Sequence, residues 1–391
     1  MNKDKKYINP IFPDISVEDF DELGKHKFSK EYKRNKRQML REYHRRKRAA
    51  SRSTYAKIAV AACLLIVSVP IVVQAATNGV FFQRIWGNLT RQNVEQHEEV
   101  LLDEQEIPYT YTFPKREYVG VDAERARKLV GGHVLSDPIE RQIGDTKLTI
   151  LSRVCDESAA VVEFKLEREG GVNAFEYSQL DNEFRGALFS DKPTFWFEFV
   201  AGSENIIVDL ERSTDDVVYC YDYMALEPDA YDKEKKGLLF EVTEYPCTRK
   251  EMFEADEKAF EAYQKNTIVD RILVPFQEPV AATKFVNADG GAVSLSPLAL
   301  DIDMQKGLGL SEEEIYDYEN VYYAAIHYKD QTTFVVREHE QKGRHSCEEK
   351  VDNTCCVSSN EQGHAVMAFN RLVDPDEIES ITVNDTTYSR K

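Results

Sequence analysis

A run of nineteen consecutive uncharged residues, 58–76, restricts how this chain can fold more than any other part of its sequence. It stands between a basic segment and an acidic one. A helix of that length, at 1.5 Å per residue, is about 28 Å long, close to the ~30 Å hydrocarbon core of a bilayer. Tyr55 on one side and Phe81, Phe82 and Trp86 on the other suit the aromatic belts at a membrane interface. We therefore expect residues 58–76 to form a transmembrane helix.

The charges on either side of this run indicate its orientation. Residues 1–57 hold 17 Lys and Arg against 8 Asp and Glu, whereas residues 77–391 hold 33 against 61. Since basic residues near a span stay inside, the N-terminus should be cytoplasmic and the C-terminal part extracytoplasmic. A cleaved signal peptide is the rival interpretation, because residues 73–75 resemble a cleavage site. Signal peptides are roughly 15–30 residues long, however, and here the apolar run begins only at residue 58, which favours a retained anchor.

The basic N-terminal segment predicts a helix with a narrow apolar stripe. Phe28, Tyr32, Met39 and Tyr43 fall on one face at helical spacing, within a stretch that lacks Gly and Pro. One interpretation is a juxtamembrane helix that sets topology and contacts anionic lipid head groups of the bilayer. The other is that the stripe binds in a groove on a cytoplasmic partner protein. The sequence alone does not decide between these two interpretations.

The region after the span predicts two β domains joined by a helical insert. We expect a polar stalk at 77–119, a first β-sandwich domain at 120–245, an insert at 246–265 and a second sandwich at 266–391. Asp122 should cap a short helix that ends at Gly131. Short β-branched and aromatic runs follow, as expected of antiparallel sandwiches. The first set is KLTILSRV, AAVVEFKL, TFWFEFV, NIIVDLE, VVYCYDYMAL and GLLFEVT; the second is IVDRILVPF, VAATKFV, AVSLSPLALDIDM, VYYAAIHYK, TTFVVRE, AVMAFN and IESITVN.

Cysteine usage leaves the redox state of the outer part open. Cys63 lies in the predicted span, and an even number of cysteines follows it: Cys155, Cys220, Cys247, Cys347, Cys355 and Cys356. An even number in an exposed compartment permits disulfides, in fifteen connectivities. The adjacent pair at 355 and 356 rarely bonds to itself, so at most one of the two would join Cys347. All six could equally stay reduced.

Residues with the chemistry of an active or metal site do not form a recognised pattern. His339-Glu340 begins like a zinc-protease motif, but the next histidine, His345, follows six residues later and leaves the helical face that two zinc ligands would share. The tightest group of soft ligands is His345, Cys347, Cys355, Cys356 and His364, whose spacing matches no standard zinc site. The acidic outer part also argues against direct nucleic-acid binding. We expect no enzymatic activity, no cofactor and no metal.

The order of these segments resembles a known type of membrane protein. The stretches FSKEYKRNKRQML, KIAVAACLLIVSVP, GVDAERARKLVGGHV, VYYAAIHYKDQTTFVVRE and FNRLVDPDEIESITVNDTTY are similar to those of an uncharacterised family of Gram-positive single-pass membrane proteins, many labelled anti-sigma-factor-like. Zinc-dependent anti-sigma domains carry a His-x3-Cys-x2-Cys arrangement, and residues 1–57 contain no cysteine. The resemblance implies a regulator of a cytoplasmic sigma factor that works without that zinc site.

Taken together, these patterns predict a single-pass membrane protein with two extracytoplasmic immunoglobulin-like β-sandwich domains. It would couple an unknown extracytoplasmic ligand or signal to a cytoplasmic partner, by resemblance a sigma factor. The alternative is a cell-surface binding or structural module that has no cytoplasmic partner, in which residues 1–57 only fix the topology.

The topology can be tested on intact cells. A protease added from outside should digest residues 77–391 and spare residues 1–57, because the charge split puts the acidic part outside. The measurement is an immunoblot with one antibody against each part. Protection of the large part would contradict the assignment.

Overall fold

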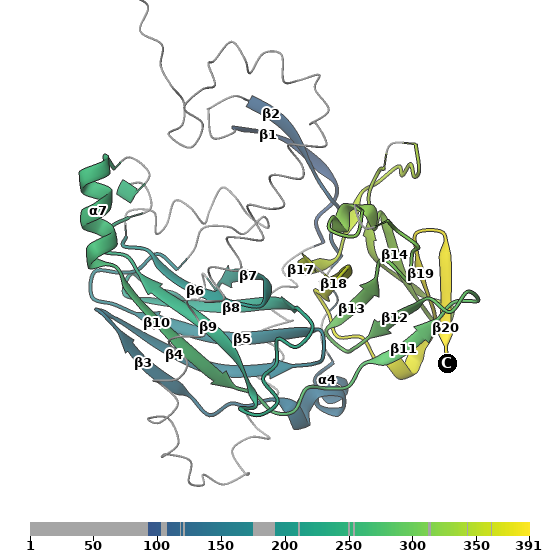
Figure 1. The fold of residues 1–391 in the computed structure, drawn as a ribbon, viewed down its shortest axis with the longest axis horizontal. Helices are drawn as coiled ribbons and strands as arrows, with labels where there is room; N and C mark the ends of the chain where they lie inside the picture. Colours follow the sequence, from purple (N-terminus) through teal and green to yellow (C-terminus); the bar gives the residue numbers. More distant parts are fainter. Residues whose placement is uncertain are drawn as a thin grey trace, which may run out of the picture. The chain divides into compact units, whose positions relative to one another are not determined.

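Strands predominate in the part of the chain that the structure describes (Figure 1). The computed structural model describes residues 93–391, apart from 103–107, 118, 120–121, 175–191, 210–211, 249–250, 253–254, 312–313, 342 and 361. The prediction of a mostly β region is confirmed. The expected span and the basic N-terminal helix lie outside the described residues. Within those residues, no helix has both the length and the apolar character needed to cross a bilayer.

The strands of the first set, together with one strand of the second, form a sandwich of two antiparallel sheets. One sheet has the order β3-β4-β5-β8-β7 and the other β10-β9-β6. Their bounds are β3 (Ile139–Ile143), β4 (Thr146–Cys155), β5 (Ala159–Glu167), β6 (Phe195–Phe199), β7 (Gly202–Val208), β8 (Val217–Leu226), β9 (Gly237–Glu244) and β10 (Ile268–Pro275). Phe164 lies 4.7 Å from Phe197, which stacks on Phe240 at 4.5 Å, ring centre to ring centre. These rings come from both sheets, so the two sheets share one apolar core.

The second set forms one nearly closed, barrel-like sheet of ten strands. Its order is β16-β15-β14-β19-β20-β11-β12-β13-β18-β17. The bounds are β11 (Thr283–Val286), β12 (Ala292–Leu295), β13 (Ala299–Asp303), β14 (Tyr323–Tyr328), β15 (Thr333–Glu338), β16 (Val351–Asp352), β17 (Thr354–Ser359), β18 (His364–Phe369), β19 (Ile378–Val383) and β20 (Thr386–Arg390). The two edge strands β16 and β17 are consecutive in sequence. A single stretch of chain therefore pairs with β15 first and with β18 afterwards.

This topology corrects the expectation of two immunoglobulin-like sandwiches, because the structure does not show two such domains. The run IVDRILVPF, expected in the second set, is β10 and pairs along its whole length with β9 of the first set. The run AVSLSPLALDIDM is two strands, β12 and β13, separated by residues 296–298. The predicted domain boundaries themselves stay a prediction.

The barrel has its own apolar core, which includes Phe285, Leu300 and Ile381, and a third apolar core joins the sandwich to the barrel. The helix α4 (Ala123–Val130) begins at its cap Asp122, whose carboxylate accepts from the backbone N–H groups of Glu124 and Arg125, as predicted. The core contains residues of three origins: Ala126 and Val130 of α4; Val154, Val161, Tyr221 and Tyr223 of the five-stranded sheet; and Leu298, Cys355, Cys356 and Val366 of the barrel. Strands β5 and β8 are therefore covered on both faces, which explains why the first four residues of AAVVEFKL are all apolar.

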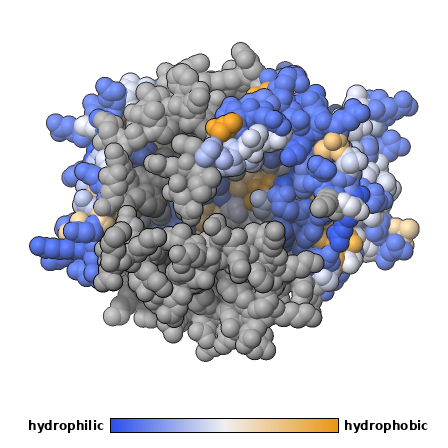
Figure 2. Space-filling model, turned by 90° about the horizontal axis from the view of Figure 1, so that it is seen from above, coloured by the Kyte–Doolittle hydropathy of each residue, from blue (hydrophilic) through white to orange (hydrophobic). Residues whose placement is uncertain are grey.

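Short elements complete the described chain. A hairpin of β1 (His97–Leu102) and β2 (Pro108–Phe113) lies where the sequence predicts a polar stalk. The helix α7 (Glu257–Asn266) lies in the expected insert, ends one residue beyond its predicted boundary and is capped by Asp256. Three 3-10 turns are described, η2 (Gly131–His133), η3 (Tyr318–Asn320) and η4 (Pro375–Glu377). The coloured surface in Figure 2 is mostly hydrophilic, with small scattered apolar patches, as the high charge content leads one to expect.

The sandwich contains a carboxyl pair that sequence patterns did not single out. Asp222 in the middle of β8 is fully buried, and neither carboxylate oxygen has a hydrogen-bond partner among the described residues. Burial, followed by the nearby charge of Glu204, raises the pKa of Asp222 well above its ordinary value. Burial likewise raises the pKa of Glu204 to about 8, against the lowering effect of the Phe199 N–H that it accepts. Both carboxyls are thus more stable protonated.

The pair predicts a pH-dependent stability. The folded pKa values lie above the unfolded values of 3.8 and 4.5. The contribution of the protonated pair to the free energy of unfolding is therefore fully present below those unfolded values. It is lost as the pH rises through the folded pKa, about 8 for Glu204. Asp222→Asn removes the free-energy cost of protonating this carboxyl, or of burying its charge, and should raise the thermal unfolding midpoint at pH 8, by roughly 2–4 °C per kcal/mol gained. The gain at pH 5 should be smaller.

The control for this measurement is Asp289→Asn, at an exposed turn position. It should leave the midpoint unchanged at both pH values. A lower midpoint for Asp222→Asn at pH 8 than for the wild type would show that the buried carboxylate stabilises the fold, contrary to this account.

Candidate functional site

The described chain enters the barrel through residues 115–117, called the strap below. The strap lies alongside the edge strand β16 in parallel: the N–H of Lys115 donates to the carbonyl of Lys350 at 2.7 Å, and the N–H of Asp352 donates to the carbonyl of Lys115 at 3.0 Å. An unpaired sheet edge exposes a row of backbone donors and acceptors. The strap satisfies part of that row and attaches the preceding hairpin to the barrel.

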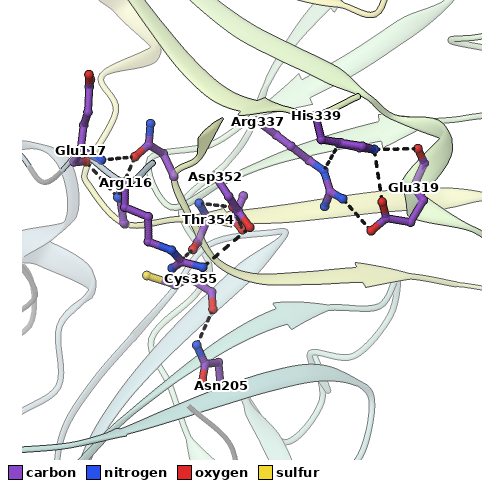
Figure 3. Close-up of polar contacts among 11 residues, drawn as sticks. Arg116, Glu117, Asn205, Glu319, Arg337, His339, Asp352, Thr354 and Cys355 are labelled. Carbon is purple, nitrogen blue, oxygen red and sulfur yellow. Dashed lines mark hydrogen bonds and ion pairs between the residues drawn. The ribbon is translucent and has the colours of Figure 1, made fainter. Parts of the chain in front are cut away.

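The other side of the strap is also paired. Arg116 and Val94 exchange two backbone hydrogen bonds of 2.8 and 2.9 Å. The Arg116 side chain reaches across β16, where Nη1 donates to the carbonyl of Thr354 at 3.3 Å and Nη2 lies 3.7 Å from Asp352 Oδ2 (Figure 3). The strap is therefore the middle strand of a small three-stranded arrangement, and its Arg116 side chain binds to the barrel.

Asn353 holds the end of the strap, and it lies at the point where β16 becomes β17. Its side-chain Oδ1 accepts from the N–H of Glu117 at 2.7 Å, and its Nδ2 donates to the carbonyl of Val335 at 2.7 Å. Its backbone N–H donates to Val336, and its carbonyl accepts from Asn370. The residue is 1% exposed. One buried amide therefore joins the strap, β15 and the segment after β18, which is the seam of the barrel.

Two further side chains hold the same strap residue. Asn370 Nδ2 donates to the carbonyl of Glu117 at 3.0 Å, and Arg371 Nη2 donates to that carbonyl at 2.5 Å. Asn370 also donates to Asn353 Oδ1 at 3.3 Å. Both backbone polar groups of Glu117 are thus bound by barrel side chains, so the attachment has a defined register.

A charged cluster supports β16 from the neighbouring strand. Arg337 on β15 is paired in register with Asp352, and its Nη2 donates to Glu319 Oε1 at 2.7 Å. Arg337 Nε donates to His339 Nδ1 at 3.0 Å, which leaves the ring proton on Nε2, 3.2 Å from Glu319 Oε2 (Figure 3). The hydrogen bond from His339, followed by the charge of Arg337, lowers the pKa of Glu319 to about 2. The cluster fixes the strand that the strap lies against.

The soft ligands noted in the sequence are not brought together. His345 bonds Glu338 at 3.1 Å, whereas His364 bonds Asp301 at 2.8 Å. Cys355 and Cys356 face the third core, and burial raises the pKa of both thiols. All six described cysteines are free. Among the described residues, no group of three or more His, Cys, Asp and Glu side chains could hold a metal ion.

Sequence patterns do not single out the residues of this junction. The candidate partner-binding residues Phe28, Tyr32, Met39 and Tyr43 lie outside the described residues. Asparagine is depleted in strands, and both Asn353 and Asn370 stand where a strand-like run stops, which is a weak signal. No local pattern marks residues 115–117, because their side-chain partners on the barrel are more than 230 positions away in the sequence.

Comparison with known proteins adds little to this geometry. No protein-family model matches the chain, and no curated protein matches it. Among solved structures, a conserved domain protein from Bacillus anthracis is similar to this chain, with 9% identity over 63% of this chain and 75% of that one, at a TM-score of 0.29. A similarity of this size supports no argument about function.

The junction predicts that one amide controls the strap. Asn353→Ala leaves the Glu117 N–H and the Val335 carbonyl without their partner, which should cost about 1–3 kcal/mol of stability. Hydrogen exchange at the Glu117 amide should become faster, while amides in the sandwich strands should exchange as in the wild type. Mass spectrometry of peptides that cover residues 108–119 measures this directly.

Asn266→Ala is the matched control, because its side-chain amide bonds only the exposed last turn of α7. It should leave hydrogen exchange in the strap unchanged. It should change the free energy of unfolding by no more than about 0.5 kcal/mol. Unchanged exchange in Asn353→Ala would show that the strap is held by its other contacts.

Proposed function

We propose that this chain is a membrane-anchored regulator that couples its β region, outside the membrane, to a cytoplasmic partner bound by residues 1–57. The charge split around residues 58–76 supports the topology, and the resemblance to anti-sigma-factor-like proteins supports a sigma factor as the partner. The proposal assigns the chain no enzymatic activity, no cofactor and no direct contact with nucleic acid.

The observation that carries this proposal is the strap. It is the point at which the chain that comes from the N-terminal side joins the barrel, and the seam residue Asn353 holds it. A change in the β region that releases the strap would free the hairpin of β1 and β2 from the barrel. The connection to the membrane would then change in length and in mobility.

The strength of the attachment suits a switch. Glu117 donates one hydrogen bond to Asn353 Oδ1 and accepts two, from Asn370 and Arg371; these three bonds are worth about 1 kcal/mol each, or roughly 3 kcal/mol together. A difference of that size changes the ratio of attached to released strap by a factor of about 150. A bound ligand or a proteolytic cut could therefore shift the equilibrium, whereas the three apolar cores would remain intact.

The apolar stripe of the basic segment provides the partner-binding test. If Tyr32 and Tyr43 insert into a protein groove, Tyr32→Ala or Tyr43→Ala should each cost about 1–3 kcal/mol, a loss of roughly tenfold or more in affinity. The measurement is capture of the candidate sigma factor by the purified full-length chain. Replacing Arg45 and Arg46 with Gln provides the comparison, because it should weaken only contact with anionic lipid and the salt dependence of binding.

Two outcomes would contradict the proposal. Capture of no cytoplasmic protein would favour the surface binding or structural module. Affinity that falls only with the arginine replacements would show that the stripe is not a docking face.

A further inference from the structure

A cleft of about 350 Å³ lies beside the strap. Its wall is formed by α4, by the turn between β14 and β15, and by the segment from Arg371 to η4. The apolar lining includes Val119, Tyr328 and Leu372, and the basic lining is Arg125 and Arg371. Its volume lies within the range of ligand pockets, about 300–1,000 Å³. Because Arg371 also binds the Glu117 carbonyl, the cleft and the strap share one side chain.

Arg371 makes no ion pair with a carboxylate in the described part of the chain, although the charge of Glu117 acts to raise its pKa. Its guanidinium lies over the ring of Phe334 at 3.8 Å and donates to two neutral acceptors, Asn370 Oδ1 and the Glu117 carbonyl. Burial lowers the pKa of Arg371 to about 10. The charge is thus held in a poorly solvated position, where a bound anion would stabilise it more than water does.

Arg125 offers a second donor on the opposite wall. Its Nη2 is paired with Glu377, but its buried Nε has no hydrogen-bond partner among the described residues. Two other lining carboxylates are already engaged locally: Asp122 accepts from the first turn of α4, and Asp330 accepts from Thr332. The unmatched hydrogen-bonding capacity of the cleft therefore belongs to its arginines.

We propose that this cleft binds a small organic carboxylate, with the carboxylate on Arg371 and the apolar body against Tyr328, Leu372 and Val119. A planar guanidinium matches a carboxylate in shape and charge, and the apolar lining favours a ligand that has more than an anionic group. The ligand carboxylate competes with the Glu117 carbonyl for Arg371 and so weakens the strap. This regulatory consequence rests on the function proposed above, whereas the binding itself does not.

The test uses the purified full-length chain with benzoate as the probe and benzamide as its neutral isostere, observed by saturation-transfer NMR. Benzoate should bind, and benzamide should bind at least tenfold more weakly. Arg371→Gln should weaken benzoate binding tenfold or more, because it removes the charged donor. Arg271→Gln, on β10 and paired with Glu241, is the matched control and should bind benzoate as the wild type does.

A second variant guards against the possibility that Arg371→Gln alters the fold. Val119 is 49% exposed, so Val119→Glu adds a carboxylate to the cleft without disturbing a core. It should also reduce benzoate binding tenfold or more. Equal binding of benzoate and benzamide, or wild-type affinity in both Arg371→Gln and Val119→Glu, would overturn the proposed site.

The competition with the strap has its own readout. Saturating benzoate should speed hydrogen exchange at the Glu117 amide in the wild type, and unchanged exchange would overturn the competition. None of these measurements involves a cytoplasmic partner. A failure to capture a sigma factor would therefore reject the proposed function and leave the carboxylate site standing. Absence of benzoate binding to the wild-type chain would reject the carboxylate site and leave the proposed function standing.

Discussion

The side-chain amide of Asn353 is the interaction on which the closure of the barrel and the attachment of the strap both depend. Its Nδ2 binds a carbonyl of β15, and its Oδ1 accepts from the strap and from Asn370. Asparagine supplies an N–H donor and an oxygen that can accept two hydrogen bonds, on one short, neutral side chain. Aspartate would lose the donor and add a buried charge, and leucine would lose both functions. The chemistry of the position thus calls for an amide.

The attachment of the strap differs in kind from the connection between the sandwich and the barrel. The sandwich and the barrel share an apolar core that includes Tyr221, Leu298 and Cys356, and Asn205 donates to the carbonyl of Cys355 at 2.8 Å. Separating them would expose this core to water, at roughly 25 cal/mol per Å² of apolar surface. Releasing the strap exchanges a few hydrogen bonds for bonds to water. Because the second change costs far less, the strap is the part of the described structure best suited to move.

Local elements were predictable from the sequence where local physics decides them. Asp122 caps α4 as predicted, because the cap and the helix are neighbours in the chain. The β-branched runs form strands as predicted, for instance VVYCYDYMAL in β8. Which strands share a sheet was not predictable: IVDRILVPF was assigned to the wrong set, because pairing depends on partners far away in sequence and not on the run itself. A single ten-stranded sheet in place of a second sandwich was missed for the same reason.

The junction was harder still to predict, because its residues have ordinary identities and acquire a role only through contacts. Glu117, Asn353 and Arg371 are separated by long stretches, and no motif connects them. Asp222 sits in an otherwise apolar strand, and an alternating pattern gives no sign that it faces the core. Conversely, the candidate stripe at Phe28, Tyr32, Met39 and Tyr43 depends on helical spacing alone and lies outside the described residues.

Mechanical pulling on single molecules tests the central claim, that the strap is the weakest link between the N-terminal side and the barrel. With handles at the two ends of the full chain, release of the strap together with opening of the β1–β2 hairpin should free about 25 residues, an increase of roughly 90 Å in contour length. This event should precede unfolding of the sandwich and the barrel, and Asn353→Ala should lower its force without changing the force of later events. If the barrel or the sandwich unfolds before any event of that length, the strap is not the weakest link and the account is wrong.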